Sequence, residues 1–114
     1  MRPVGGLTVS QERLAKEALA ADLAQEPSLA AVAAACGLPV GRLVRALRQT
    51  TGMPPYRWLR AHRVERAKDL LLTSHLTLAQ IAYDCGFADQ SHFTRVFAAT
   101  VGAPPGAWRR GRRG

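Results

Sequence analysis

Two stretches of the chain decide the fold: SLAAVAAACGL at residues 28–38 and TLAQIAYDCGF at residues 77–87. They lie 49 residues apart, and Leu, Ala, Ala, Cys and Gly recur at matching positions. Each stretch opens with a hydroxyl side chain suited to cap a helix, and each ends near a glycine, which readily takes the left-handed conformation that terminates a helix. Thr77 and Gln80 also form a capping-box pattern. The sequence therefore predicts one short helix and turn, present twice.

The repeat continues beyond the glycine, one residue out of step. Residues 43–60 match residues 93–110 at a spacing of 50, and both contain the pattern Gly-x-Pro-Pro-x-x-Trp. The second copy has therefore gained one residue between its turn glycine and its next helix. Two copies are too few for a solenoid, which needs about three or more, and they suit a duplicated recognition unit.

The rest of the chain also has helical patterns. Ser10 predicts the cap of a helix that Pro27 ends, whereas the proline pair at 54–55 predicts a helix to about Thr73 and the pair at 104–105 a short last one. No strand alternation is present, so we expect an all-α fold of about seven helices, with two homeodomain-like helix-turn-helix subdomains joined by a long middle helix. The expected parts are a flexible lead-in (1–9), a first unit (10–53), the linker helix (54–73), a second unit (74–110) and a basic, frayed tail (111–114).

The charge of the chain favours a polyanionic partner. The formal net charge is +8, and 14 of the 16 basic residues are arginine. Residues 1–36 carry three basic and four acidic side chains, whereas residues 37–114 carry thirteen and four. Arginine suits bidentate contact with phosphate and with guanine. A solubilising surface is the alternative, because net charge indicates association and not a site.

Several classes of protein find no support in the sequence. No apolar run approaches the roughly 18 residues of a membrane span, and no apolar segment follows the N-terminal charge as in a secretory signal. We expect Cys36 and Cys85 to be small buried residues in a reduced, cytoplasmic protein and not a disulfide. No nucleophile–base pair, paired carboxylates, phosphate loop or zinc-ligand spacing is found, so no enzymatic activity, metal or cofactor is predicted.

The second helix of each copy is the expected DNA-reading element. A helix-turn-helix needs a small residue where its helices cross, a turn glycine and an apolar residue that pins the second helix. These are Ala33, Gly37 and Leu43 in the first copy and Ala82, Gly86 and Phe93 in the second. The side chains expected to face inward are Leu43, Ala46, Leu47, Thr50, Phe93, Val96, Phe97 and Thr100.

Outward side chains of these two helices can meet base edges. Arg suits guanine, Gln suits adenine, and Val or the Thr methyl suits the thymine methyl. The predicted base contacts are Arg42, Val44, Arg45, Arg48 and Gln49 in the first copy, and Gln90, Ser91, His92, Thr94 and Arg95 in the second. Solvated helix faces are the alternative, and for His92 so is a plain surface position.

Contacts to the DNA backbone are expected from helix ends and from further arginines. Free amides at a helix N-terminus can hold a phosphate, although capping alone also explains a hydroxyl there. The predicted backbone contacts are Ser28, Arg57, Arg60, Arg63, Thr77, Arg109 and Arg110. Trp58 and Trp108, each at one fixed spacing after a proline pair, are expected to be core residues.

At these residues the chain resembles the AraC/XylS family of bacterial transcription regulators. The most specific match is Ile81-Ala82-x-x-Cys85-Gly86-Phe87-x-x-Gln90-Ser91-His92-Phe93-x-Arg95-x-Phe97, followed by Gly102-x-x-Pro105, and Arg63-x-x-x-Ala67-x-x-Leu70-Leu71 also fits. The resemblance covers residues 10 to about 110. It implies two recognition helices that enter successive major-groove segments on one DNA face, about 34 Å apart. It also implies binding as a monomer unless a missing domain dimerises the chain, with RNA polymerase as a further candidate partner.

The first copy departs from the family pattern at two positions. Pro39 stands where a Ser or Thr cap is usual, and Gly41 stands where a larger side chain often reaches a base. We therefore expect the first copy to depend on Arg42, Arg45 and Arg48, and the second to supply more of the specificity. The predicted function is sequence-specific binding of double-stranded DNA in transcription regulation. The alternatives are a module that binds an acidic protein and a non-specific DNA binder.

Overall fold

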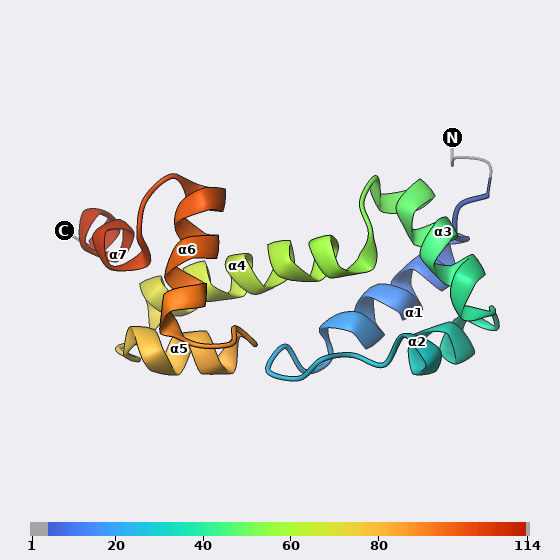
Figure 1. Cartoon of the computed structure of the whole chain (residues 1–114), viewed down its shortest axis with the longest axis horizontal. Helices are drawn as coiled ribbons and strands as arrows, with labels where there is room; N and C mark the ends of the chain where they lie inside the picture. The colour runs from blue at the N-terminus through green and yellow to red at the C-terminus, as the bar shows by residue number, and fades with distance from the viewer. Residues whose placement is uncertain (1–4, 114) are drawn as a thin grey trace. The chain divides into compact units, whose positions relative to one another are not determined.

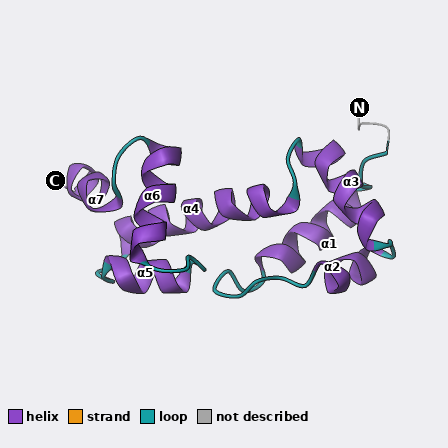
Figure 2. Cartoon of the chain, in the orientation of Figure 1, coloured by secondary structure: helices purple, strands orange, loops and turns teal. Residues whose placement is uncertain are grey.

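The computed structural model describes residues 5–113, which form seven helices joined by loops and turns without a strand (Figures 1 and 2). The helices are α1 (Val9–Ala20), α2 (Leu29–Cys36), α3 (Val40–Thr51), α4 (Pro55–Thr73), α5 (Leu78–Asp84), α6 (Gln90–Val101) and α7 (Pro105–Arg113). The predicted all-α fold is confirmed. The chain forms two compact units, and the division between them falls inside α4, between Ala61 and His62. We call them the N-terminal unit and the C-terminal unit.

The N-terminal unit packs α1 against α2 and α3 around one apolar cluster. The cluster is formed by Leu7, Ala15, Leu19, Val32, Ala33, Cys36, Leu43, Ala46 and Leu47, with Trp58 packed against it. The Gln11 side chain ties α1 to the end of α2, because its Nε2 donates to the Cys36 carbonyl at 3.3 Å. Leu43 of α3 is fully buried, as its predicted role of pinning the second helix requires.

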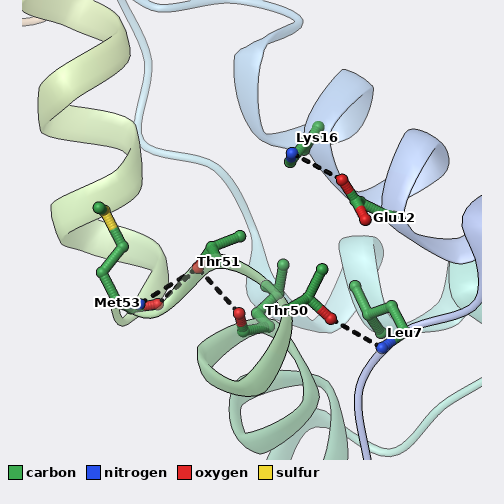
Figure 3. Close-up of polar contacts among 7 residues, drawn as sticks. Leu7, Glu12, Lys16, Thr50, Thr51 and Met53 are labelled. Carbon is green, nitrogen blue, oxygen red and sulfur yellow. Dashed lines mark hydrogen bonds and ion pairs between the residues drawn. The ribbon is translucent and has the colours of Figure 1, made fainter. Parts of the chain in front are cut away.

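The start of the chain is more ordered than the sequence predicts. Helix α1 begins at Val9 and is capped by Thr8, which forms a capping box with Gln11, so Ser10 lies inside the helix and not at its cap. Leu7 is buried, and its amide donates to Thr50 Oγ1 at 2.8 Å (Figure 3). The predicted flexible lead-in is therefore wrong from Leu7 onward, and residues 1–4 lie outside the described residues.

Helix α1 also ends earlier than predicted. It stops at Ala20, because a turn follows in which Asp22 Oδ1 accepts from the Ala24 amide at 3.1 Å. Its first turn carries Glu12, which pairs with Lys16 at 2.8 Å (Figure 3). At the end of α3 the Thr51 hydroxyl donates to the Leu47 carbonyl at 2.8 Å and accepts from the Met53 amide at 3.3 Å, which leads the chain into α4.

The C-terminal unit is built on the second half of α4. Its apolar cluster consists of Val64, Ala67, Leu71, Ile81, Ala82, Cys85, Phe87, Phe93 and Phe97, with Trp108 packed against it. Aromatic rings run through this core: the centroid distances are 5.0 Å from Phe87 to Phe93, 5.7 Å from Phe93 to Phe97 and 5.6 Å from Phe97 to Trp108. Trp58 and Trp108 are half-buried and pack against the two clusters, so each extends the core at its edge instead of lying within it.

Both cysteines are buried free thiols, as predicted. Burial raises the pKa of Cys85 to about 11, an effect that the charge of Arg66 partly opposes. Burial also raises the pKa of Cys36. A protonated buried thiol behaves as a small apolar side chain, so the two residues serve packing.

Two expectations about the C-terminal unit are wrong. The predicted frayed tail is helical, since α7 continues to Arg113. Thr100, expected to face inward like Thr50, is exposed. The two threonines differ because the Leu7 amide donates to the Thr50 hydroxyl in the N-terminal unit, whereas the Thr100 side chain makes no hydrogen bond among the described residues.

Within residues 5–113, no single helix has the length and apolar character needed to cross a membrane. Helices α2 and α3 meet those criteria by length and composition only when taken together, with a bend of 80° between them.

Candidate nucleic-acid interface

The N-terminal unit contains a helix-turn-helix made of α2 and α3. Gly37 has φ +69°, and its amide donates to the Ala33 and Ala34 carbonyls, so the left-handed residue ends α2 as the sequence predicts. The two helices bend by 80° across this turn. Helix α3 then starts at Val40 behind Pro39, whose side chain makes no capping hydrogen bond. The free amides at the start of α3 therefore find no acceptor on the side chain of the capping residue.

The C-terminal unit repeats this geometry with a longer turn and better caps. Helix α5 starts on the complete capping box of Thr77 and Gln80, which confirms that prediction. Gly86 has φ +83°, and the Phe87 amide donates to the Ala82 carbonyl at 2.9 Å. Asp89 caps α6, because its Oδ1 accepts from the His92 amide in the first turn at 2.7 Å. The extra residue of this copy lies in the loop over residues 86–89.

The outward side of α3 carries uncompensated positive charge. Arg42, Arg45 and Arg48 are exposed, and none of them pairs with a carboxylate of the described chain. Gln49 is exposed beside them, and Val44 is half-buried. These are the predicted outward residues of the first copy. A cluster of unpaired guanidinium groups on one helix face attracts phosphate and guanine edges.

The outward side of α6 is more varied in its chemistry. Gln90, Ser91 and Arg95 are exposed, whereas His92 and Thr94 are half-buried. The ring of His92 is not free to turn, because the Ala88 amide donates to its Nδ1 at 3.2 Å. Arg95 makes no ion pair among the described residues. The structure thus brings the predicted residues of the second copy onto the first turns of one helix.

The predicted backbone contacts fall into two groups. Ser28 and Thr77 cap their helices, accepting from the Ala31 and Gln80 amides at 3.1 Å each, so capping is observed and a phosphate contact remains a prediction. Arg57, Arg60 and Arg110 are exposed, which leaves them able to reach a phosphate, and Arg63 is half-buried.

Arg109 has a different role from the phosphate contact that the sequence suggests. Its guanidinium donates to the carbonyls of Leu71 and Leu76 at 2.9 Å each, of Ser74 at 3.1 Å and of Leu70 at 3.5 Å. Leu70 and Leu71 lie in the last turn of α4, and Ser74 and Leu76 lie in the turn that leads into α5, so one guanidinium joins the helix end to that turn. Burial lowers the pKa of Arg109, and the charge of Arg113 adds to that shift. We therefore assign Arg109 to the internal structure of the C-terminal unit and not to the DNA backbone.

Arg113 contacts the same helix end. Its guanidinium donates to the Leu72 carbonyl at 3.2 Å and also to the Ser74 carbonyl. Together, Arg109 and Arg113 fix α7 to the turn that leads into α5. The repeat contained a signal for this clamp, since the first copy has Leu59, a buried core residue, at the position equivalent to Arg109.

Sequence reasoning also missed the partner of His92, because a backbone amide leaves no trace in a residue pattern. No group of three or more His, Cys, Asp or Glu side chains that could hold a metal ion occurs within residues 5–113.

Comparisons with known proteins agree on one type of domain. Residues 32–111 match the model of a family described as a helix-turn-helix domain. The HTH-type transcriptional activator RhaS of Escherichia coli O157:H7 is 38% identical over 91 residues, which are 80% of this chain and 33% of RhaS. The chain thus spans about a third of the length of the curated relatives that it matches.

Solved structures show the same fold. The DNA-binding domain of AdpA, a global transcriptional factor crystallised with a target DNA, has a TM-score of 0.79 at 28% identity, covering 90% of this chain and 92% of that one. A Chromobacterium violaceum regulator with an AraC-type DNA-binding domain also has a TM-score of 0.79, covering 92% and 96%. At 24% identity, this second likeness concerns the fold alone.

Proposed function

The chain belongs to the AraC/XylS family of helix-turn-helix DNA-binding domains, and from this premise we propose that it binds duplex DNA sequence-specifically in a bacterial transcription regulator. The observation that carries the proposal is the duplication: α3 and α6 each follow a glycine turn, and each presents exposed arginine without a carboxylate partner. The relatives named above are described as transcriptional regulators, which supports a regulatory role for this chain.

The proposed mechanism is groove insertion by both recognition helices. The first turns of α3 and α6 meet base edges in successive major-groove segments, as in other helix-turn-helix proteins. Arginine and glutamine supply the donors that select guanine and adenine. The free amides behind Ser28 and Thr77, with Arg57, Arg60 and Arg63, supply phosphate contacts that set the register and carry no sequence information.

The two units contribute unequally in this proposal. Helix α3 starts without a side-chain cap and has Gly41 in its first turn, so its reading depends on Arg42, Arg45 and Arg48. Helix α6 is capped and offers amide, hydroxyl, imidazole and guanidinium groups. We propose that the C-terminal unit therefore supplies more of the base specificity.

One chain supplies both recognition helices, which supports binding as a monomer. The proposed location of such a DNA-binding regulator is the bacterial cytoplasm. RNA polymerase is a proposed second partner of a regulator of this kind. An acidic protein as the sole partner is the rival function, and the uncompensated arginines serve it equally well. The groove-reading side chains of α6 favour DNA, because the adjacent donor and acceptor of a glutamine amide match an adenine edge, whereas carboxylates offer only acceptors.

Selection from a random duplex pool with the purified 114-residue chain tests the function. We expect one enriched sequence that binds at least about 10³-fold better than random duplex, as specific regulators do. An advantage below about tenfold would reduce the proposal to non-specific binding. Salt dependence does not separate the two, since both release counterions.

The matched variants Arg45→Ala and Arg95→Ala test the two helices at equivalent positions. We expect each to cost about 1–3 kcal/mol on the enriched sequence, with relaxed preference at one base in its own half-site. An equal loss on all duplexes would reassign that arginine to a phosphate. Equal specificity in both half-sites, measured by substituting each base pair in turn, would contradict the unequal contribution.

A further inference from the structure

The ring of His92 is held in place by the loop that contains the extra residue of the C-terminal unit. The Ala88 amide donates to Nδ1 at 3.2 Å, and the imidazole and the buried Phe87 ring meet in a T-shaped contact with the centroids 5.7 Å apart and the planes at 63°. The backbone of His92 is held as well, because its amide donates to Asp89 Oδ1 at 2.7 Å. Ring and backbone are therefore positioned by the same few residues.

The Ala88 amide determines which ring nitrogen can carry a proton. A backbone amide only donates, so Nδ1 must be an unprotonated acceptor, and the proton of the neutral ring is on Nε2. No described group pairs with Nε2. In the described residues that are not exposed, every buried side-chain nitrogen has a hydrogen-bond partner, so the unpaired Nε2 is not buried. Nε2 consequently reaches solvent, and His92 presents one outward hydrogen-bond donor and no outward acceptor.

Such a donor distinguishes cytosine from the other bases. In the major groove, guanine offers N7 and O6, adenine offers N7 and thymine offers O4 as acceptors, whereas cytosine offers only its N4 amino donor. Residues in the first turn of a recognition helix are those that meet base edges, and His92 is the third residue of α6. A fixed donor at this place finds no acceptor on cytosine.

We propose, on the basis of the DNA-binding function proposed above, that His92 is a specificity-determining residue that excludes cytosine at one position of the second half-site. The longer loop of the C-terminal unit matters for this role, because it supplies the Ala88 amide that donates to the His92 ring. The shorter loop of the N-terminal unit has Leu38 and Pro39 in this region, and proline has no amide proton to donate. The equivalent helix position there is taken by Arg42, which is a donor by its own chemistry.

The tautomer is measured directly in the free chain by long-range ¹H–¹⁵N NMR of the imidazole ring. We expect the neutral ring to be a single tautomer protonated at Nε2, together with slow hydrogen exchange at the Ala88 amide. A ring protonated at Nδ1, or a rapidly exchanging mixture with an unprotected Ala88 amide, overturns the inference whatever the chain does on DNA.

Base discrimination is measured with the enriched duplex and with versions that place each base in turn opposite α6. We expect cytosine at one position to weaken binding of the unaltered chain about tenfold, the order of one lost neutral hydrogen bond. His92→Ala should remove this penalty and leave other preferences in place. His92→Gln should reduce the penalty, because an amide group offers an acceptor to the cytosine amino group as well as a donor.

Arg42→Ala is the matched control, since it alters the equivalent position of the N-terminal unit and should leave the cytosine penalty unchanged. A uniform loss on all sequences with His92→Ala would make His92 a phosphate contact and overturn the inference, while the function itself stands. Failure to enrich any sequence would defeat the function and the base preference together, and the NMR result would then show whether the ring geometry was correct.

Discussion

The two units share a pattern of buried apolar residues, here called the frame, and differ in the polar groups that cap and join their helices. Leu43 and Phe93 are both fully buried at the position that pins the recognition helix. The caps differ, because Pro39 makes no side-chain hydrogen bond and Asp89 makes one of 2.7 Å. Both units therefore keep an apolar side chain at a pinning position where truncation costs several kcal/mol, and differ in a cap worth about 1 kcal/mol.

The largest expected effect concerns the shared frame. Phe93→Ala removes a ring that contacts Phe87 and Phe97, and should lower the free energy of unfolding of the C-terminal unit by about 3–5 kcal/mol. Urea unfolding followed by Trp108 fluorescence in a Trp58→Phe background reports on this unit. Leu43→Ala, followed by Trp58 in a Trp108→Phe background, is the matched change and should cost about 2–5 kcal/mol in the N-terminal unit. A loss near 1 kcal/mol in either case would contradict the pinning role.

The frame was also the part that the sequence predicted well. The all-α class, the glycine turns and the Thr77–Gln80 cap follow from local patterns that the structure confirms. The repeat was informative because an internal copy acts as a comparison: a pattern kept twice indicates buried packing. Helical periodicity then placed most of the outward residues of α3 and α6 at the surface, although Val44, His92 and Thr94 are half-buried.

What the sequence did not predict depends on contacts between distant residues. Leu7 is buried through a bond to Thr50, 43 positions away, and Arg109 reaches carbonyls more than 30 positions earlier. Neither contact leaves a periodic signal. From the sequence, an arginine near a basic C-terminus is expected to contact phosphate. Only the structure shows that the Arg109 guanidinium donates to backbone carbonyls instead.

The Arg109 clamp is the next largest difference between the units. Arg109→Ala leaves carbonyls at the end of α4 and in the following turn without their charged donor, and hydrogen bonds to a charged group are worth about 1.5–3 kcal/mol. We expect a loss of about 2–3 kcal/mol in the unfolding of the C-terminal unit and none in the N-terminal unit. Arg110→Ala, an exposed neighbour, is the control and should change stability by less than about 0.5 kcal/mol. Equal effects of the two variants would show that the clamp is not stabilising.

The caps provide a smaller effect that can be changed in both directions. Asp89→Ala should cost about 1 kcal/mol, because the His92 amide loses its acceptor. Pro39→Asp should gain a similar amount in the N-terminal unit, since it supplies a cap to α3 where none exists. Thermal or urea unfolding of each unit, read by its own tryptophan, measures the two changes. A gain in the C-terminal unit from Pro39→Asp would show that the two units do not unfold separately.

Substitution of Gly41 gives the smallest expected change in stability. It also allows a comparison with Gly106, because an arginine lies near each of the two glycines. A Cβ at Gly41 would lie 3.5 Å from Arg45 Nη1, an ordinary contact, so Gly41→Ala should stabilise α3 by about 0.5–1 kcal/mol. Gly106 is the matched position in α7: a Cβ there would lie 3.5 Å from Arg110 Nη1 and also 3.7 Å from the Leu78 side chain. Gly106→Ala should therefore stabilise its helix by a similar amount without touching a recognition helix. If Gly41→Ala weakens binding to the enriched duplex and Gly106→Ala does not, the loss comes from the position of Arg45. Gly41 then allows the Arg45 guanidinium to lie close to α3, and the N-terminal unit has a less stable helix as a result.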